Sequence, residues 1–176
     1  MTLEQFRKSD IILVCGLPGS GKSHFSRKYF MKSGSKRVSR KEIRMHLYEM
    51  MNFGAKWSED KFDLVDETLV KHIERKLIEH LLQMGESIIL DNMSLSSSSR
   101  EPYITVAKRM KKNISAIFMD TDTATCLKRN REREPGDMVP EKIIANLAAG
   151  IEYPERREGL SEVLVLKNYE ETLSAD

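Results

Sequence analysis

The run Ile11-Ile12-Leu13-Val14-Cys15 leads directly into the loop Gly16-Leu17-Pro18-Gly19-Ser20-Gly21-Lys22-Ser23. Five consecutive apolar residues of this kind are typical of a buried parallel strand. After the loop, Phe25 and Tyr29 lie four residues apart, which is the spacing of one helix face. The sequence therefore predicts a strand, a glycine-rich loop and a helix, in that order.

The loop has the form G-x-x-x-x-G-K-[ST], which binds the phosphates of nucleoside triphosphates. Glycines let successive backbone N–H groups converge on phosphate oxygens, and the N-terminus of the following helix adds partial positive charge. We expect Lys22 to reach the β- and γ-phosphates and the Ser23 hydroxyl to bind Mg²⁺. Residues 16–23 and the adjoining His24 are therefore predicted to bind ATP, with GTP as the alternative.

The composition is ordinary for a globular enzyme, with 40% hydrophobic and 32% charged residues among 176. This length predicts one domain over residues 1–176. A net charge of +2 is too small to indicate nucleic-acid binding without local clusters. Neither a membrane-spanning run nor a signal-peptide pattern is present, and Cys15 and Cys126 lack metal-ligand spacing. We therefore expect a cytoplasmic protein with reduced thiols and no membrane partner.

Apolar strand candidates alternate with helical segments, a pattern that predicts stacked βαβ units and a parallel sheet. The expected strands are residues 11–15, a short segment around Val38, and residues 87–90, 114–119 and 163–166. The expected helices are residues 22–33, 41–51, 59–84, 97–111, 123–133 and 140–150. The sequence thus predicts an α/β fold.

Local signals define the ends of several helices. Ser58 is a good N-cap for the helix over 59–84, and Gly85 suits a left-handed C-cap. Trp57 precedes the cap and can pack on Phe62, so we interpret Trp57 as a packing residue rather than a substrate platform. Pro140 opens the last helix, where its missing N–H costs nothing.

A carboxylate ends the strand at 87–90. Asp91 follows this strand, and ligands of open α/β sheets bind at the carboxyl ends of strands. Asp91 is therefore predicted to hold Mg²⁺ next to Ser23, directly or through water. Asp120 and Asp122 are rival candidates, and a simple turn aspartate is the alternative. We favour Asp91 because the strand beside the loop strand usually carries this group.

The segment Lys128-Arg129-Asn130-Arg131-Glu132-Arg133-Glu134-Pro135-Gly136 is rich in arginine. Arg129 and Arg133 lie four residues apart and share a helix face, whereas Arg131 points elsewhere. A lid here, over about residues 128–140, would bring arginines to a transferring phosphoryl group and exclude water. The alternative is an ordinary solvated helix face.

Four segments together resemble the polynucleotide 5′-hydroxyl kinases and closely similar P-loop kinases. They are Gly16–Ser23, Val38–Arg44, Asp91–Leu95 and Arg129–Arg133, and the likeness extends through Pro154 to residues 158–161. The resemblance implies a P-loop kinase core with a five-stranded parallel sheet and helices on both faces. It also implies transfer of the γ-phosphoryl group of a nucleoside triphosphate to an acceptor hydroxyl, on a nucleic-acid end or a small phosphorylated molecule.

Site roles are also implied by this resemblance. Lys22 and Ser23 serve the donor phosphates and the metal, Arg44 grips a phosphate of the acceptor, and Arg133 is the lid arginine. Arg129 matches the lid pattern less closely than Arg133 does.

One position departs from the family pattern. The family carries an aspartate as general base three residues before Arg44, where this chain has Lys41. The ordinary lysine pKa of ~10.4 would have to fall by about three units before Lys41 could act as a base at neutral pH. Glu42 is a nearby carboxylate, but it lies about 100° around the helix. Two further hypotheses therefore stay open, namely a nucleotide-binding regulatory protein with weak transfer and a small-molecule or sugar-nucleotide kinase.

Overall fold

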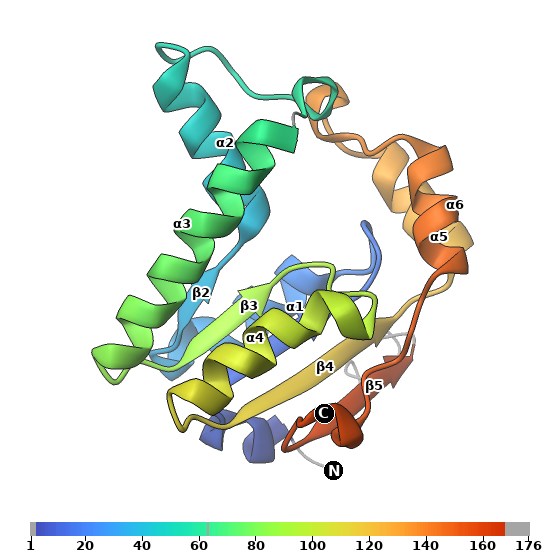
Figure 1. Cartoon of the computed structure of the whole chain (residues 1–176). Coiled ribbons are helices and arrows are strands. Elements are labelled where there is room, and N and C mark those ends of the chain that lie inside the picture. Colours follow the sequence, from blue (N-terminus) through green and yellow to red (C-terminus); the bar gives the residue numbers. More distant parts are fainter. Residues whose placement is uncertain (1–2, 63, 168–176) are drawn as a thin grey trace.

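The computed structural model describes residues 3–62 and 64–167 and contains a parallel sheet in the order β2-β3-β1-β4-β5 (Figure 1). Its strands are β1 (Ile11–Cys15), β2 (Lys36–Val38), β3 (Ile88–Asp91), β4 (Ile114–Asp120) and β5 (Val163–Lys167). Every strand pair is parallel. The predicted five-stranded parallel sheet is confirmed, and β3 lies beside β1 as expected, with Asp91 in register with Val14.

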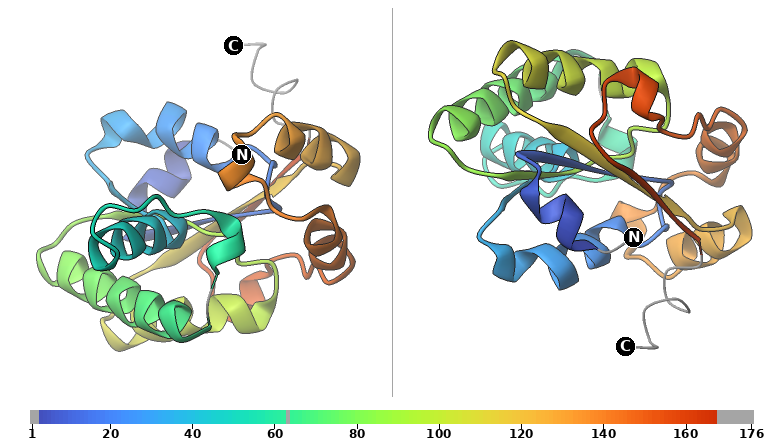
Figure 2. Two further views of the ribbon diagram at one scale, coloured as in Figure 1. Left: turned by 90° about the horizontal axis from the view of Figure 1, so that it is seen from above. Right: turned by 90° about the horizontal axis from the view of Figure 1, so that it is seen from below.

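Helices cover both faces of the sheet (Figure 2). The central strand β1 is therefore buried on each side. Ile11 and Leu13 pack with side chains of α3 and α4, such as Ile78. Ile12 packs in a second cluster with Phe25 of α1. The α-helices are α1 (Lys22–Phe30), α2 (Arg40–Met51), α3 (Leu64–Gln83), α4 (Ser97–Arg109), α5 (Thr123–Arg131) and α6 (Glu141–Ala149). The short 3-10 helices are η1 (Leu3–Lys8), η2 (Met31–Ser33), η3 (Glu59–Lys61), η4 (Pro135–Asp137) and η5 (Arg156–Glu158).

The predicted helix over 59–84 is wrong at its start. Residues Glu59–Lys61 form the separate turn η3, and Phe62 has extended backbone with ψ of 124°. The Ser58 hydroxyl donates to the Asp60 carboxylate and makes no side-chain capping bond. The end is as predicted, because Gly85 adopts a φ of +79° and Glu86 N–H bonds Leu81 O. In the last helix, Pro140 lies at the N-cap position, directly before α6.

A buried polar network fixes the start of α2 against the sheet. The Arg40 N–H donates to Asn92 Oδ1 at 2.9 Å, directly after β3. The Arg40 guanidinium bonds Glu74 of α3 at 2.6 Å and the Tyr103 hydroxyl of α4 at 2.6 Å. The first turn of α2 is therefore held by three elements, which orients the next residue, Lys41, away from the sheet core.

A fully buried arginine holds the loop before β5. The Arg100 side chain is fully buried on α4 and donates twice to Glu158, with both distances 2.8 Å. It also donates to Ser94 O at 3.0 Å and Glu152 O at 2.9 Å. These bonds join the segment after β3 to the segment around η5.

The turns η3 and η4 meet above the loop that joins β1 to α1 (Figure 1). A Cβ placed on Gly136 would lie 3.4 Å from Ser58 Cβ, which is ordinary contact distance. The connection between α2 and α3 thus meets the connection between α5 and α6, which joins two sides of the molecule that lie far apart in the sequence. Among the residues described, no helix combines the length and apolar character needed to cross a bilayer.

Candidate active site

The loop after β1 has the backbone that a phosphate cradle needs. Gly19 and Gly21 adopt φ values of 85° and 93°, in the left-handed region that favours glycine. A Cβ on Gly19 would lie 2.4 Å from Cys126 O, so α5 packs directly against the loop. The Thr121 hydroxyl donates to Ser20 O at 3.1 Å. The loop is therefore held in place by the segment that follows β4.

Lys22 opens α1 and folds back over the loop, where Nζ donates to Leu17 O at 2.7 Å. Burial lowers the pKa of Lys22 to about 8, and the nearby Asp91 charge only partly offsets this shift. Ser23 is half-buried beside it, Leu17 and Pro18 are buried, and His24 is exposed. The ammonium is thus positioned to exchange a carbonyl partner for an anion.

Asp91 is buried at the carboxyl end of β3, next to the loop strand. Its Oδ2 accepts two hydrogen bonds from Arg37 of β2, at 2.9 and 2.6 Å.

The two rival aspartates have other partners. Asp122 caps α5 by accepting from Thr125 N at 2.8 Å, and Asp120 accepts from the Tyr153 hydroxyl at 2.9 Å. Within residues 3–62 and 64–167, no cluster of three or more acidic, histidine or cysteine side chains could hold a metal. Asp91 and Asp120 both end strands that pair with β1, and of the two it is the Asp91 charge that acts on the pKa of Lys22, the neighbour of Ser23.

The side chains of Lys41 and Glu42 diverge from α2. Lys41 Nζ donates to Asp137 Oδ1 of η4 at 2.9 Å and lies 3.8 Å from Glu59 Oε1 of η3. Glu42 instead accepts from Arg37 at 2.6 Å, on the side of β2. The two side chains therefore leave α2 in different directions, as expected, and Lys41 faces the wall formed by η3 and η4.

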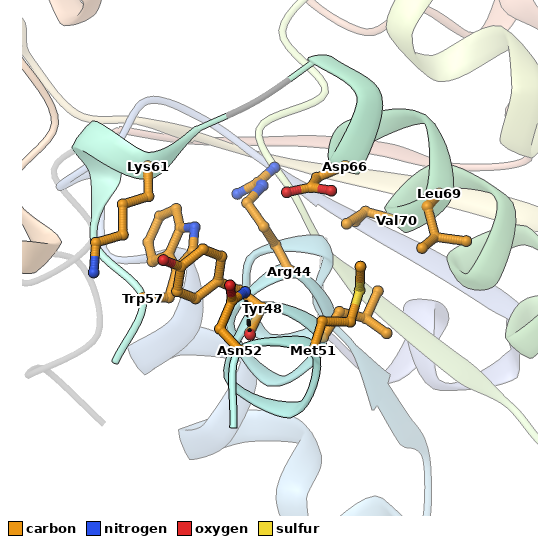
Figure 3. A pocket seen from close by; sticks show the side chains of 10 residues that line it. Arg44, Tyr48, Met51, Asn52, Trp57, Lys61, Asp66, Leu69 and Val70 are labelled. Atoms are coloured by element: carbon orange, nitrogen blue, oxygen red, sulfur yellow. Dashed lines mark hydrogen bonds between the residues drawn. The ribbon is translucent and has the colours of Figure 1, made fainter. Parts of the chain in front are cut away.

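Arg44 lies one turn further along α2 and is paired with a buried carboxylate. It donates to Glu67 Oε2 at 2.9 and 2.6 Å, and its guanidinium lies 5.8 Å from the Trp57 ring centre. Figure 3 shows its tip between the Trp57 ring and Asp66, in a pocket between α2 and α3. Trp57 is 7% exposed, which favours a packing residue over a substrate platform, and its contact with Phe62 stays a prediction.

The pocket in Figure 3 is too small for a nucleotide. Its volume of about 20 Å³ holds roughly one water molecule. The residues that line it are Arg44, Leu47, Tyr48, Met51, Asn52, Trp57, Lys61, Asp66, Leu69 and Val70. It is a gap in the α2–α3 packing, and the phosphate loop contributes no side chain to it.

The three arginines of the 128–136 segment have different surroundings. Arg129 is half-buried, with Nη1 3.4 Å from Gly19 O in the phosphate loop. Arg131 is exposed and bonds Glu141 of α6 at 2.5 and 3.0 Å, so it does point elsewhere. Arg133 is half-buried, and its charge acts on the pKa of both Lys22 and Glu59. The Arg133 charge therefore acts on both the phosphate loop and η3.

Sequence reasoning missed several residues of this site. Glu59 and Asp137 both meet Lys41, although they lie far apart in the chain, and no local pattern marks them. Arg37 binds Asp91 across the β2–β3 pair, and a charged residue inside a short strand is a weak signal for such a role. Asn130 is 2% exposed and bonds both Val139 N and Val139 O, which closes the loop after α5.

The strand order and the phosphate loop together define a P-loop kinase fold. The family model AAA_33, an AAA domain, matches residues 11–154, and the chain belongs to this family. The resemblance to P-loop kinases of the polynucleotide-kinase type is thereby confirmed.

Two curated proteins are similar to the chain. L-seryl-tRNA(Sec) kinase from Methanococcus maripaludis is 27% identical over 82% of this chain and 53% of its own length. Heterogeneous nuclear ribonucleoprotein U-like protein 2 from Homo sapiens is 24% identical over 88% of this chain and 21% of its own length. The chain therefore spans about half of the first relative and about a fifth of the second.

A solved structure has the same fold. A chain of the Pnkp1/Rnl/Hen1 RNA repair complex superposes with a TM-score of 0.63 at 20% sequence identity. The alignment covers 80% of this chain and 43% of that chain. At this identity the likeness describes the fold alone.

Proposed function

We propose that the chain is an ATP-dependent kinase that transfers the γ-phosphoryl group to an acceptor hydroxyl, on the 5′ end of a polynucleotide or on a related nucleotide. One observation carries the proposal: the segment from α5 to η4 joins the donor loop to the opposite wall. Its Cys126 carbonyl packs on Gly19, and its Asp137 binds Lys41. A segment that contacts both sides can close over a phosphoryl group in transfer.

Each side chain has a role in this proposal. The loop N–H groups and Lys22 hold the donor phosphates, while Arg133 stabilises the charge that spreads over the transferring group. Arg44 binds an acceptor phosphate after exchanging its Glu67 partner. Arg129 holds the loop from the α5 side.

Mg²⁺ is part of the same proposal. The Ser23 hydroxyl would hold the ion directly and Asp91 would hold it through water, because Arg37 already occupies Asp91 Oδ2. Mg²⁺ keeps several of its waters and is commonly held by one or two protein groups plus substrate phosphates, which fits this pair. The ion would neutralise charge on the donor phosphates.

The nucleic-acid acceptor is supported by two kinds of likeness. Four segments of the sequence follow the polynucleotide-kinase pattern, and one relative, L-seryl-tRNA(Sec) kinase, is named for a tRNA substrate. Acceptor binding should therefore weaken steeply as salt rises.

The test is transfer of radiolabel from γ-labelled ATP to 5′-hydroxyl RNA, 5′-hydroxyl DNA, tRNA, nucleosides and nucleotides. Lys22→Ala, which removes the donor-phosphate cation, is the negative control. Transfer only to nucleosides, nucleotides or sugars would replace the nucleic-acid acceptor by a small one. Absence of transfer to every acceptor by wild-type protein would overturn the proposed function.

A second candidate function is nucleotide binding without efficient transfer. The observation that favours it is Lys41, which stands at the family's base position and is paired with Asp137. The ribonucleoprotein relative, whose name denotes no kinase, is compatible with this reading. Tight ATP binding together with no transfer to the whole acceptor panel would support it.

A further inference from the structure

Glu59 of η3 is the second carboxylate beside Lys41, after Asp137. Its Oε1 lies 3.8 Å from Lys41 Nζ, within ion-pair distance of the position where related kinases carry their base. The contact is too long for a hydrogen bond, so this lysine does not occupy the Glu59 oxygen directly. The Glu59 side chain is 20% exposed, which leaves a path to a bound molecule.

Charged groups face Glu59 from every element packed against it. Those that act on its titration are Lys41 and Arg44 of α2, Asp137 of η4, and Arg133 before η4. Burial raises the pKa of Glu59, while Lys41 and Arg44 partly counter that shift. The carboxylate is therefore a stronger base than an ordinary glutamate, and the charges of three cations act on it.

Other carboxylates of this wall are engaged differently. Glu67 holds Arg44 through two hydrogen bonds, and Glu42 holds Arg37 on the far side of α2. Asp137 is bonded to Lys41 at 2.9 Å and has a 43% exposed side chain. Glu59 combines proximity to the base position, partial burial and a contact with Lys41 that is not a hydrogen bond.

We propose that Glu59 replaces the missing base of α2 and accepts the proton of the acceptor hydroxyl, an inference that rests on the proposed kinase function. The acceptor oxygen forms a bond to the γ-phosphorus of ATP, and the bond from that phosphorus to the β-γ bridging oxygen breaks. The electron pair leaves with ADP, and the hydroxyl proton moves to a Glu59 oxygen and then to solvent. Lys41 keeps the carboxylate ionised before the transfer.

The experiment compares Glu59→Gln with Asp60→Asn. A general base contributes about 10²–10⁴-fold, so Glu59→Gln should lower kcat by at least about 100-fold. The Km for ATP should change little, because the side-chain contact of Glu59 is with Lys41 on the acceptor side. Asp60 is the next residue, is exposed and bonds Ser58, so Asp60→Asn should retain wild-type kcat.

The pH profile separates a base from a structural residue. In wild type, kcat should fall as pH falls through the raised pKa of Glu59, because the protonated carboxyl cannot accept a proton. Glu59→Asp should retain that acidic limb, whereas Glu59→Gln should lose it.

Restoring the carboxylate on α2 provides a second test. Lys41→Asp combined with Glu59→Gln should recover at least tenfold of the lost kcat, while Lys41→Asp alone should gain little. Wild-type kcat and an unchanged acidic limb in Glu59→Gln would overturn the assignment and leave the kinase function standing. No transfer by wild-type protein to any acceptor would overturn both.

Discussion

The Lys41 ammonium donates a hydrogen bond to Asp137 Oδ1 at 2.9 Å and thereby ties the first turn of α2 to η4. These residues are 96 positions apart in the chain, and both side chains are partly exposed, at 36% and 43%. The bond joins the acceptor wall to the segment that also packs on the phosphate loop. Closure of the two sides is thus linked to the residue that replaces the family's base.

Breaking this bond should free η4 without unfolding the protein. Lys41→Ala and Asp137→Ala should each speed amide hydrogen exchange in residues 132–139. A double-mutant cycle should give a coupling free energy of about 0.2–1 kcal/mol, the range for partly exposed pairs. Lys112→Ala removes a comparable pair with Asp10 at 3.0 Å and should leave exchange in η4 unchanged. Unaltered exchange in both Lys41→Ala and Asp137→Ala would show that the bond does not hold η4.

ATP affinity should fall as the pH rises past the pKa of Lys22. That pKa is lowered to about 8 by burial. In the proposed function the triphosphate would pair with the protonated ammonium. Below about pH 7 the lysine is almost fully charged and the affinity should be nearly flat. Between pH 7 and pH 9 the protonated fraction falls from about nine tenths to about one tenth, so the Kd should rise about tenfold. Isothermal titration calorimetry measures the Kd. Lys22→Met lacks the titrating group, and a slope equal to the wild-type slope in this variant would contradict the assignment.

The donor side of the site could be predicted from the sequence because its geometry is local. The β1 run and the eight-residue loop place Lys22 and Ser23 through contiguous backbone, and the observed β1 has the predicted bounds. Asp91 follows from the sheet rule that parallel strands end at one edge. These positions needed no knowledge of distant contacts.

The opposite wall could not be predicted in the same way. The break at Phe62 separates η3 from α3, although Ser58 and the following charges resemble a helix start. η3 lies against η4, as the contact between Ser58 and Gly136 shows, and that packing joins segments nearly 80 residues apart. The positions of Glu59 and Asp137 depend on this long-range contact, so local patterns carried no sign of them.

Arg133→Ala should lower kcat at least tenfold and change the acceptor Km little. The expected reason is that Arg133, whose charge acts on both Lys22 and Glu59, stabilises charge that develops mainly in the transition state. Arg131→Ala is the matched control, because Arg131 is two residues away and bonds Glu141 at the surface. Steady-state kinetics with varied acceptor separate kcat from Km. A change in acceptor Km alone would assign Arg133 to ground-state binding.

Arg100→Ala should be strongly destabilising although it lies outside the proposed chemistry. The substitution leaves Glu158, which is 14% exposed, without its bidentate partner and strips hydrogen bonds from Ser94 O and Glu152 O. Removing one member of a buried ion pair costs about 3–5 kcal/mol. Urea denaturation should show this as a lower midpoint at unchanged m-value.

Two variants serve as controls for Arg100→Ala. Arg109→Ala breaks an exposed pair with Glu79 and should cost less than about 1 kcal/mol. Arg100→Lys keeps the charge but loses the paired donors to Glu158, so its stability should lie between that of wild type and that of Arg100→Ala. A loss below 1 kcal/mol in Arg100→Ala would mean that the segment around η5 is held by its apolar contacts, such as Leu160 in the main core, and not by this arginine.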